Sequence, residues 1–285
     1  MFPQTEMGGD PGAVRSYAEA VSDLGYHHIV AYDHVVGADP TVHKAWEGPY
    51  DLRSTFHEPF VLFGYLAALC RLELVTGIVI LPQRQSVLVA KQAAEVDLLT
   101  EGRFRLGVGL GWNRVEYEAL GKDFSNRGKR LAEQVSLMRR LWTEESVSFQ
   151  GEFETVTGAG LAPMPVQRPI PVWFGAQAAS RAALRRVGQL ADGWFPLVAP
   201  GPELDQARRI VAEAALEAGR DPADIGMEGR LDFADGDLER LGREAELWRS
   251  MGASHLCVTT IGAGLQRLDD HIGALGAVVE VLAAT

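Results

Sequence analysis

The chain has 285 residues, a length that suits one barrel-sized α/β domain, because (β/α)8 barrels typically have about 250 residues. Its formal net charge of −11 disfavours a nucleic-acid or anionic-membrane partner. The sequence also lacks a secretory signal pattern and an apolar run of about 18 residues, which predicts a soluble, cytoplasmic protein.

Predicted strands and helices alternate along the whole chain. Apolar periodicity with glycine and proline breaks predicts helix 11–24, strand 27–32, helix 59–69, strand 72–81, helix 87–99, strand 104–108, helix 127–142, strand 171–175, helix 178–190, strand 193–198, helix 203–218, strand 226–233, helix 237–251, strand 254–260 and helix 265–283. A short first strand near Phe2 completes eight βα units. Repeated βαβ units imply a parallel sheet covered by helices, and eight of them close a barrel. We therefore predict a single TIM (β/α)8 barrel domain over residues 1–285, with an open doubly wound sheet as the alternative.

Two segments interrupt this alternation. Residues 34–58 form a long connection rich in Gly, Pro, His and aromatic residues, where about 2–6 residues would be usual, so they are a candidate lid or substrate loop. Residues 146–170 are predicted to form a small hairpin insertion, because apolar residues alternate from Val147 to Val156 and three prolines follow. We expect both as loop insertions at the C-terminal face of the barrel.

The cysteines and histidines do not suggest a metal centre. Cys70 and Cys257 lie inside apolar runs, which predicts buried, reduced thiols and fits a reducing cytoplasm. His43 and His57 share the long loop with His34, but their spacing matches no compact ligand pattern. We therefore expect no metal site.

The most informative motifs lie between residues 76 and 113. Thr-Gly-Ile-Val-Ile-Leu-Pro over residues 76–82 is a β-branched run stopped by proline, typical of a strand buried on both faces. Gly-Arg-Phe-Arg-Leu-Gly-Val-Gly-Leu-Gly-Trp-Asn over residues 102–113 follows a helical segment. Its alternate glycines remove side chains where parallel strands present ligand sites, so a backbone can approach a planar cofactor closely.

Taken together, these motifs resemble the luciferase-like monooxygenase family of flavin-dependent oxidoreductases, especially its branch that uses the deazaflavin coenzyme F420. The resemblance implies a luciferase-like barrel with a non-proline cis peptide at Gly77–Ile78. Relatives usually have several residues before the Phe-Pro-Gln-Thr-Glu element, so the first strand looks clipped, which suggests a mis-set start or a truncation. By this resemblance the cofactor-binding residues are Thr76, Gly77, Ile78, Gly109, Leu110, Gly111, Trp112, Asn113, Gly175, Ala176, Gln177 and Ser180.

The turn from Gly175 to Ser180 ends a strand and opens a helix. Small residues there expose backbone N–H groups at the helix N-terminus, and the Ser180 hydroxyl adds a donor, so the turn could hold an anion. The resemblance assigns it to the cofactor phosphate, and an ordinary helix cap is the alternative. A second small-residue turn, Gly262-Ala263-Gly264, is a weaker phosphate candidate.

Asp33 and His34 directly follow the second predicted strand, so they lie at the rim where barrel enzymes keep catalytic groups. The family motif has an acidic residue and a histidine there. We predict that His34 transfers a proton beside the cofactor ring, because imidazole titrates near working pH. Asp33 orients His34 or the cofactor, or it caps the loop. Glu116 is displaced from the turn where some deazaflavin enzymes keep an acid, so it receives no such role. Trp46 and Tyr50 form a substrate wall or anchor the loop.

The resemblance predicts an F420-dependent oxidoreductase that moves hydride to or from a small organic substrate. The chemical rival is an FMN-dependent monooxygenase with a separate reductase that supplies reduced cofactor. A rival of another class is a non-catalytic flavin or F420 carrier. Because the family commonly dimerises and the 59–69 helix is apolar on several faces, we also expect a homodimer that buries this helix.

Overall fold

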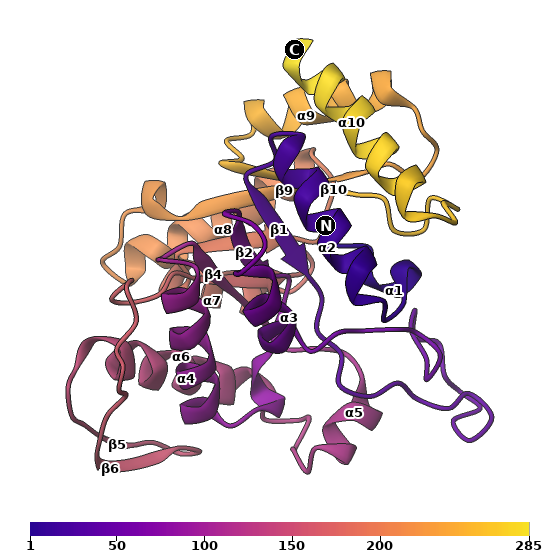
Figure 1. Ribbon diagram of the computed structural model, residues 1–285. Coiled ribbons are helices and arrows are strands. Elements are labelled where there is room, and N and C mark those ends of the chain that lie inside the picture. Colours follow the sequence, from indigo (N-terminus) through magenta and orange to yellow (C-terminus); the bar gives the residue numbers. More distant parts are fainter. Residues whose placement is uncertain (285) are drawn as a thin grey trace.

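The computed structural model describes residues 1–284, and a parallel sheet curls around their centre (Figure 1). Its strands lie side by side in the order β1 (His28–Ala31), β2 (Glu73–Thr76), β4 (Phe104–Gly109), β7 (Val172–Ala176), β8 (Gly193–Pro196), β9 (Gly226–Asp232) and β10 (His255–Thr259), while β3 (Val79–Ile80) pairs with β4. Every one of these pairings is parallel. The α/β barrel fold predicted from the sequence is therefore confirmed.

The expected first strand is the exception, and that part of the prediction is wrong. At the seam between β1 and β10, the Met1 amino group donates to the Val258 carbonyl oxygen at 2.6 Å, and the Phe2 N–H donates to the Val30 carbonyl oxygen at 2.8 Å. Pro3 has no N–H to extend this pairing, and helix α1 (Gln4–Met7) begins immediately. Two backbone hydrogen bonds therefore replace the strand that was expected near Phe2.

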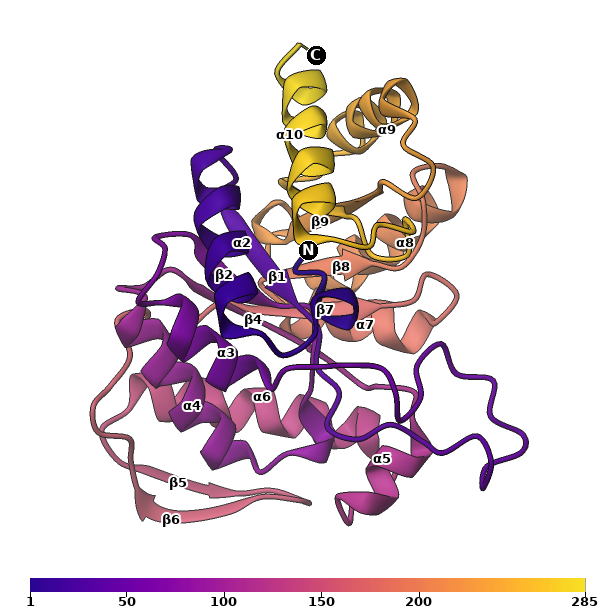
Figure 2. The same cartoon turned by 45° about the vertical axis from the view of Figure 1, so that its right-hand side comes forward.

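Helices pack around the outside of the sheet (Figure 2). In chain order the long ones are α2 (Pro11–Asp23), α3 (Pro59–Leu66), α4 (Ser86–Leu99), α6 (Arg127–Thr143), α7 (Arg181–Leu190), α8 (Pro202–Glu217), α9 (Leu238–Ser250) and α10 (Leu268–Ala284), with short turns α5 (Arg114–Ala119), η1 (Leu81–Gln83) and η2 (Pro222–Asp224) between them. The apolar core fills the space between helices and strands: the rings of Phe63 and Phe104, for example, lie 6.2 Å apart. The last helix, α10, lies beside α2, so the first and last long helices of the chain pack together.

The predicted strand 72–81 is divided into β2 and β3. A cis peptide bond joins Gly77 to Ile78 between them, as expected from the family resemblance. Glycine is required at two neighbouring positions, because a Cβ on Gly77 would overlap the Val30 side chain and one on Gly107 would overlap the Thr76 carbonyl oxygen. The apolar pattern of residues 74–81 could not reveal this interruption, because the interruption depends on contacts with β1 and β4.

The insertion at 146–170 is a hairpin, as predicted, with antiparallel strands β5 (Val147–Gln150) and β6 (Thr155–Ala159). It lies along the outside of α6, where Arg130 pairs with Glu154 at 2.9 Å. Both cysteines carry free thiols, and Cys257 is buried while Cys70 is only half-buried.

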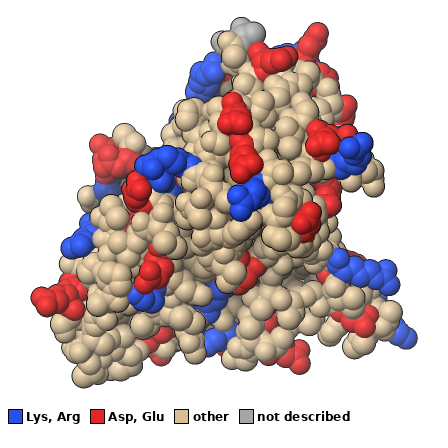
Figure 3. Space-filling view, in the orientation of Figure 1, with Lys and Arg blue, Asp and Glu red and all other residues tan. Residues whose placement is uncertain are grey.

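Charged side chains of both signs are interspersed over the face shown in Figure 3. No helix in the described part of the chain, residues 1–284, is long and apolar enough to cross a membrane.

Candidate active site at the mouth of the barrel

His34 lies at the carboxyl end of β1 inside a cage of aromatic rings. Its imidazole centroid is 4.7 Å from that of Phe56, 5.5 Å from that of Tyr50 and 5.6 Å from that of Trp112. The side chain is only 12% exposed. The long loop 34–58 supplies two of the three rings, so Tyr50, which we expected as either a substrate wall or a loop anchor, contributes directly to the surroundings of His34.

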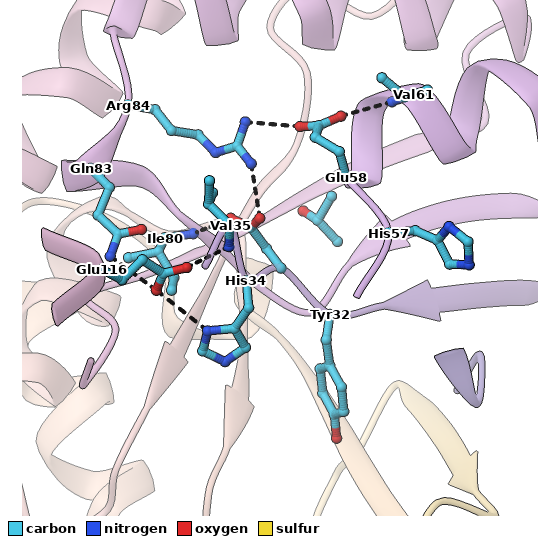
Figure 4. Close-up of polar contacts among 12 residues, drawn as sticks. Tyr32, His34, Val35, His57, Glu58, Val61, Ile80, Gln83, Arg84 and Glu116 are labelled. Atoms are coloured by element: carbon cyan, nitrogen blue, oxygen red, sulfur yellow. Dashed lines mark hydrogen bonds and ion pairs between the residues drawn. The ribbon is translucent and has the colours of Figure 1, made fainter. Parts of the chain in front are cut away.

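Glu116, to which the sequence assigned no role, is the polar partner of His34. It lies buried in the first turn of α5, and its Oε2 is 3.3 Å from His34 Nδ1 (Figure 4). The same carboxylate accepts hydrogen bonds from the Val35 N–H and from Gln83 Nε2. Burial alone would raise the pKa of Glu116, but the hydrogen bonds from His34, Val35 and Gln83 outweigh it and hold that pKa below its usual value.

An ionised Glu116 determines the tautomer of His34. A carboxylate only accepts hydrogen bonds, so Nδ1 of the neutral imidazole must carry the proton, and Nε2 is left as the acceptor. In this neutral tautomer, Nε2 is the nitrogen that can take a proton from a ligand. The sequence contained a partial signal, since Asn113 caps α5 and Glu116 is three residues later, as in a capping box.

The Asp33 carboxylate is engaged by residues other than its neighbour His34. Its Oδ1 accepts from Arg84 Nη2 at 2.8 Å and its Oδ2 accepts from the Ile80 N–H at 3.0 Å. Arg84 also pairs with Glu58 at the far end of the rim loop, at 2.9 Å. Burial raises the pKa of Asp33 and the Arg84 guanidinium opposes that rise. Of the roles considered for Asp33, these contacts favour an anchor: it ties the start of the rim loop to β3.

The glycine-rich strand ends surround the side chain of Ile78. A Cβ on Gly109 would lie 2.7 Å from Ile78 Cδ1, and one on Gly175 would lie 3.3 Å from Ile78 Cγ2. Gly111 has a φ of +65°, a conformation that glycine adopts at low cost. Thr76 is fully buried and donates its hydroxyl to the Gly107 carbonyl oxygen at 2.7 Å. The glycines thus make room for an apolar bulge at the mouth.

The residues after Gly111 shape the neighbouring wall. Asn113 accepts from the Glu116 N–H at 3.2 Å and donates to the Val36 carbonyl oxygen at 3.3 Å, while the Leu110 carbonyl oxygen accepts from Tyr117. Trp112 is exposed, and its ring lies 5.4 Å from that of Trp46. Asn113 and Leu110 therefore support the turn through hydrogen bonds, and the partly exposed Trp112 ring lies beside both His34 and Trp46.

The two candidate phosphate turns differ. Ser180 caps α7 by accepting from the Ala183 N–H at 3.4 Å, and Gln177 before it is exposed, so the helix N-terminus is accessible. Ala176 ends β7 beside Gly175. At the second turn, the Gly262 N–H donates to the Glu6 carboxylate at 2.8 Å. A carboxylate of the chain itself holds that turn, which leaves the α7 N-terminus as the stronger anion site.

A cavity of about 340 Å³ opens beside His34. Its lining residues come from the rim loop and from the turn after β4: His34, Val35, Val36, Gly37, Tyr50, Asp51, Leu52, Ser54, Phe56, Trp112 and Asn113. A volume at the lower end of the usual range for ligand pockets, about 300–1,000 Å³, suits a small molecule.

His57, in the same loop, makes a polar contact with a backbone oxygen. His57 Nε2 is 3.2 Å from the Gly8 carbonyl oxygen. Within residues 1–284, the group whose ligand atoms lie close enough to hold a metal ion is His28, Glu228 and Cys257, inside the barrel. Arg105 pairs with Glu228 at 2.8 Å, so this group already contains its own cation.

A family model described as luciferase-like monooxygenase matches residues 2–256. The chain belongs to the luciferase-like monooxygenase family. An uncharacterized protein of Mycobacterium tuberculosis is 39% identical to this luciferase-like protein over 188 residues, 65% of this chain and 64% of its own length. An F420-dependent hydroxymycolic acid dehydrogenase of the same organism is 34% identical over 166 residues, 56% of this chain and 44% of its own length. The match thus spans less than two thirds of either relative.

The fold of this luciferase-like protein is also found in a solved F420-dependent secondary alcohol dehydrogenase in complex with an F420-acetone adduct. The two superpose with a TM-score of 0.80 at 17% identity, over 96% of each chain. With so low a sequence identity, the superposition shows that the two proteins share the barrel fold.

That geometry fits a flavin-like cofactor. No side chain stands on Gly109 or Gly175, and Ile78 offers an apolar surface between them on which a flat ring can rest. The first turn of α7 presents backbone N–H groups for a phosphate. Ile78, the N-terminus of α7 and His34 thus all lie at the carboxyl ends of the strands of the luciferase-like barrel.

Proposed function

We propose that this protein is an F420-dependent oxidoreductase that transfers hydride to or from a small organic substrate. The observation that carries the proposal is the His34–Glu116 pair, which places an imidazole with an unprotonated Nε2 at the edge of a cavity, at the face where Ile78 and the glycine strand ends fit a flat ring. The F420-dependent relative supports the same cofactor.

When bound, the deazaflavin supplies the carbon that accepts or donates hydride. The chain's own contribution is to hold the substrate and to move one proton. As an alcohol is oxidised, His34 Nε2 takes the hydroxyl proton, and Glu116 stabilises the imidazolium through Nδ1. In carbonyl reduction the same nitrogen returns the proton. The rim aromatics Phe56 and Trp112 restrict the access of water to this transfer.

Titration of the purified protein with F420 and with FMN, each followed by its fluorescence, tests the cofactor. We expect F420 to bind more tightly than FMN and hydride transfer to follow when a substrate is added. Tighter FMN binding, with oxygen uptake in the presence of a separate reductase, would favour the monooxygenase instead. Tight F420 binding without turnover on a panel of alcohols and ketones would favour a carrier.

We also propose a homodimer formed through α3. Four of its six large apolar residues, Phe60, Leu62, Phe63 and Leu66, are buried within the subunit. Val61, by contrast, is 74% exposed, and Leu88 on the adjoining helix α4 is also exposed. Light scattering should then give a mass near twice 31.0 kDa, and Val61→Glu should shift it towards the monomer.

A further inference from the structure

We propose that the cavity beside His34 selects an uncharged substrate in which one alcohol or carbonyl oxygen is attached to an apolar body, such as an aliphatic secondary alcohol or its ketone. This inference rests on the proposed function, because it names the substrate class of the same site. It follows from what lines the cavity and from which polar groups there are already engaged.

Large apolar side chains and polar groups share the cavity wall. The rings of Phe56 and Trp112 flank His34. Val35, Val36 and Leu52 also line the cavity, and all three are exposed. Large apolar side chains that stay exposed around one cavity are a common feature of binding sites for apolar ligands. Burial of such a wall by a substrate would stabilise the complex by about 0.8 kcal/mol for each methylene group.

The charged and polar groups of the wall argue against an anionic substrate. None of the lining residues is lysine or arginine, and one of them, Asp51, is an acid whose carboxylate accepts from the Arg53 N–H at 2.8 Å. A phosphorylated sugar or a carboxylate would therefore meet no cation and would face a carboxylate instead.

Most of the polar atoms in this wall have partners within the chain. Asn113 uses its carbonyl oxygen and its amide group on Glu116 and Val36, and Ser54 accepts from the Asp51 N–H at 3.1 Å. His34 Nε2 is left to bind a substrate oxygen, and the Tyr50 ring lies 5.5 Å from the imidazole. A substrate with several hydroxyl groups would leave most of them unpaired against apolar side chains, at a cost in affinity.

Isothermal titration calorimetry with 2-alkanones from butanone to decanone tests this proposal, both on the protein alone and after saturation with F420. We expect the dissociation constant to fall about three- to fourfold for each added methylene until the cavity is filled, which corresponds to about 0.8 kcal/mol per group. Glucose 6-phosphate, as the anionic probe, should bind at least tenfold more weakly than octanone.

Leu52→Ala, with Leu247→Ala on α9 as a matched control, assigns the effect to this wall. The two leucines are similarly exposed, at 51% and 53%, but only Leu52 lines the cavity. Leu52→Ala should weaken octanone binding about five- to tenfold and butanone binding much less, while Leu247→Ala should change neither. KM for octanone should rise with kcat nearly unchanged.

Affinity that does not vary with chain length, or glucose 6-phosphate binding as tightly as octanone, would overturn the proposal. The calorimetry separates this failure from a failure of the proposed function. Ketone binding with the expected slope but without F420 binding would leave the substrate class standing and reject the cofactor. F420 binding and turnover, with a ketone affinity that does not depend on chain length, would leave the cofactor standing and reject the substrate class.

Discussion

The two ends of the barrel interior contain the same kinds of side chain, a histidine beside a buried carboxylate, but they are closed in different ways. The floor is the end of the barrel near the start of the strands, where His28, Glu73, Arg105 and Glu228 meet. There Glu228 lies 3.1 Å from His28 and 2.8 Å from Arg105, and Arg105 also pairs with Glu73 at 2.9 Å. At the mouth, Glu116 contacts His34, and the other face of the imidazole meets aromatic rings and a cavity.

This difference favours a structural role for the His28 group and the proposed proton transfer for the His34 group. Every charge at the floor is matched by a partner, and the Arg105 guanidinium also lies 4.2 Å from the centre of the Trp173 ring. Such a network orders the barrel and has little freedom to act on a ligand. At the mouth, one imidazole nitrogen is fixed by Glu116 and the other is left for a substrate. The following experiments should affect one end of the barrel and leave the other unchanged.

His34→Ala should produce the largest loss of activity. A positioned general acid or base is typically worth about 10²–10⁴-fold in rate, so turnover should fall by that factor while F420 affinity changes far less. Stopped-flow measurement of hydride transfer provides the rate, and the limb of its pH profile that depends on His34 should move or vanish. A loss within about threefold, well short of this range, would reduce His34 to part of the pocket wall.

Arg105→Met should produce the largest loss of stability. Arg105 is 3% exposed, and its removal leaves Glu228 buried with too little positive charge, which typically costs about 3–5 kcal/mol. Urea denaturation measures the loss, and F420 affinity of the folded fraction should be unchanged. Arg71→Met is the matched control, because its pair with Glu101 lies on the surface and should contribute little. Equal losses of stability in the two variants would contradict a stabilising role for the Arg105–Glu228 pair.

The floor should also make stability depend on pH on the alkaline side. Burial lowers the pKa of His28, but contacts with Cys257 and Glu228 outweigh it and raise the pKa to about 9. A folded-state pKa above the unfolded value of 6.5 means that this stabilisation is complete below pH 6.5 and is lost as pH rises through 9. The free energy of unfolding should fall by on the order of 2–3 kcal/mol over that window.

His28→Gln should flatten this pH dependence, and His255→Gln serves as the control because burial lowers the pKa of His255 instead. Denaturation curves at pH 6, 7.5 and 9 measure it. A wild-type profile that is flat over this range would show that His28 is not held protonated by the floor.

Glu116→Gln should have a moderate effect at the mouth. The substitution keeps the shape of the side chain but removes the charge that stabilises the His34 imidazolium, and a hydrogen bond to a charged group contributes about 1.5–3 kcal/mol. Turnover should fall about ten- to hundredfold with KM nearly constant, and the pH profile should shift. A purely structural role would instead lower stability and leave the pH profile in place.

Ser180→Ala should have the smallest effect of the series. Loss of an N-cap hydroxyl costs about 0.5–2 kcal/mol, and a phosphate at α7 would lose one donor. F420 affinity should fall several-fold, and the affinity of octanone at the His34 cavity should be unchanged. Ser86→Ala, at a helix start without a side-chain cap, is the control.

Local patterns in the sequence were enough to predict the βα alternation, the long rim loop, the hairpin and the position of His34 at a strand end. Periodicity and glycine or proline breaks report such features because they depend on neighbours a few residues away. The cis peptide at Gly77–Ile78 was predicted only through the family motif, since apolar pattern alone suggested one continuous strand.

Only the tertiary structure decided which side chains meet. Glu116 reaches His34 across 82 positions, and Arg84 reaches Asp33 across 51, because closure of the barrel brings the ends of separate strands to one rim. The floor network likewise joins Arg105 to Glu228 across 123 positions. No local pattern encodes these distances. The sequence by itself determined most of the elements and the family, and the curvature of the sheet decided which carboxylate pairs with His34.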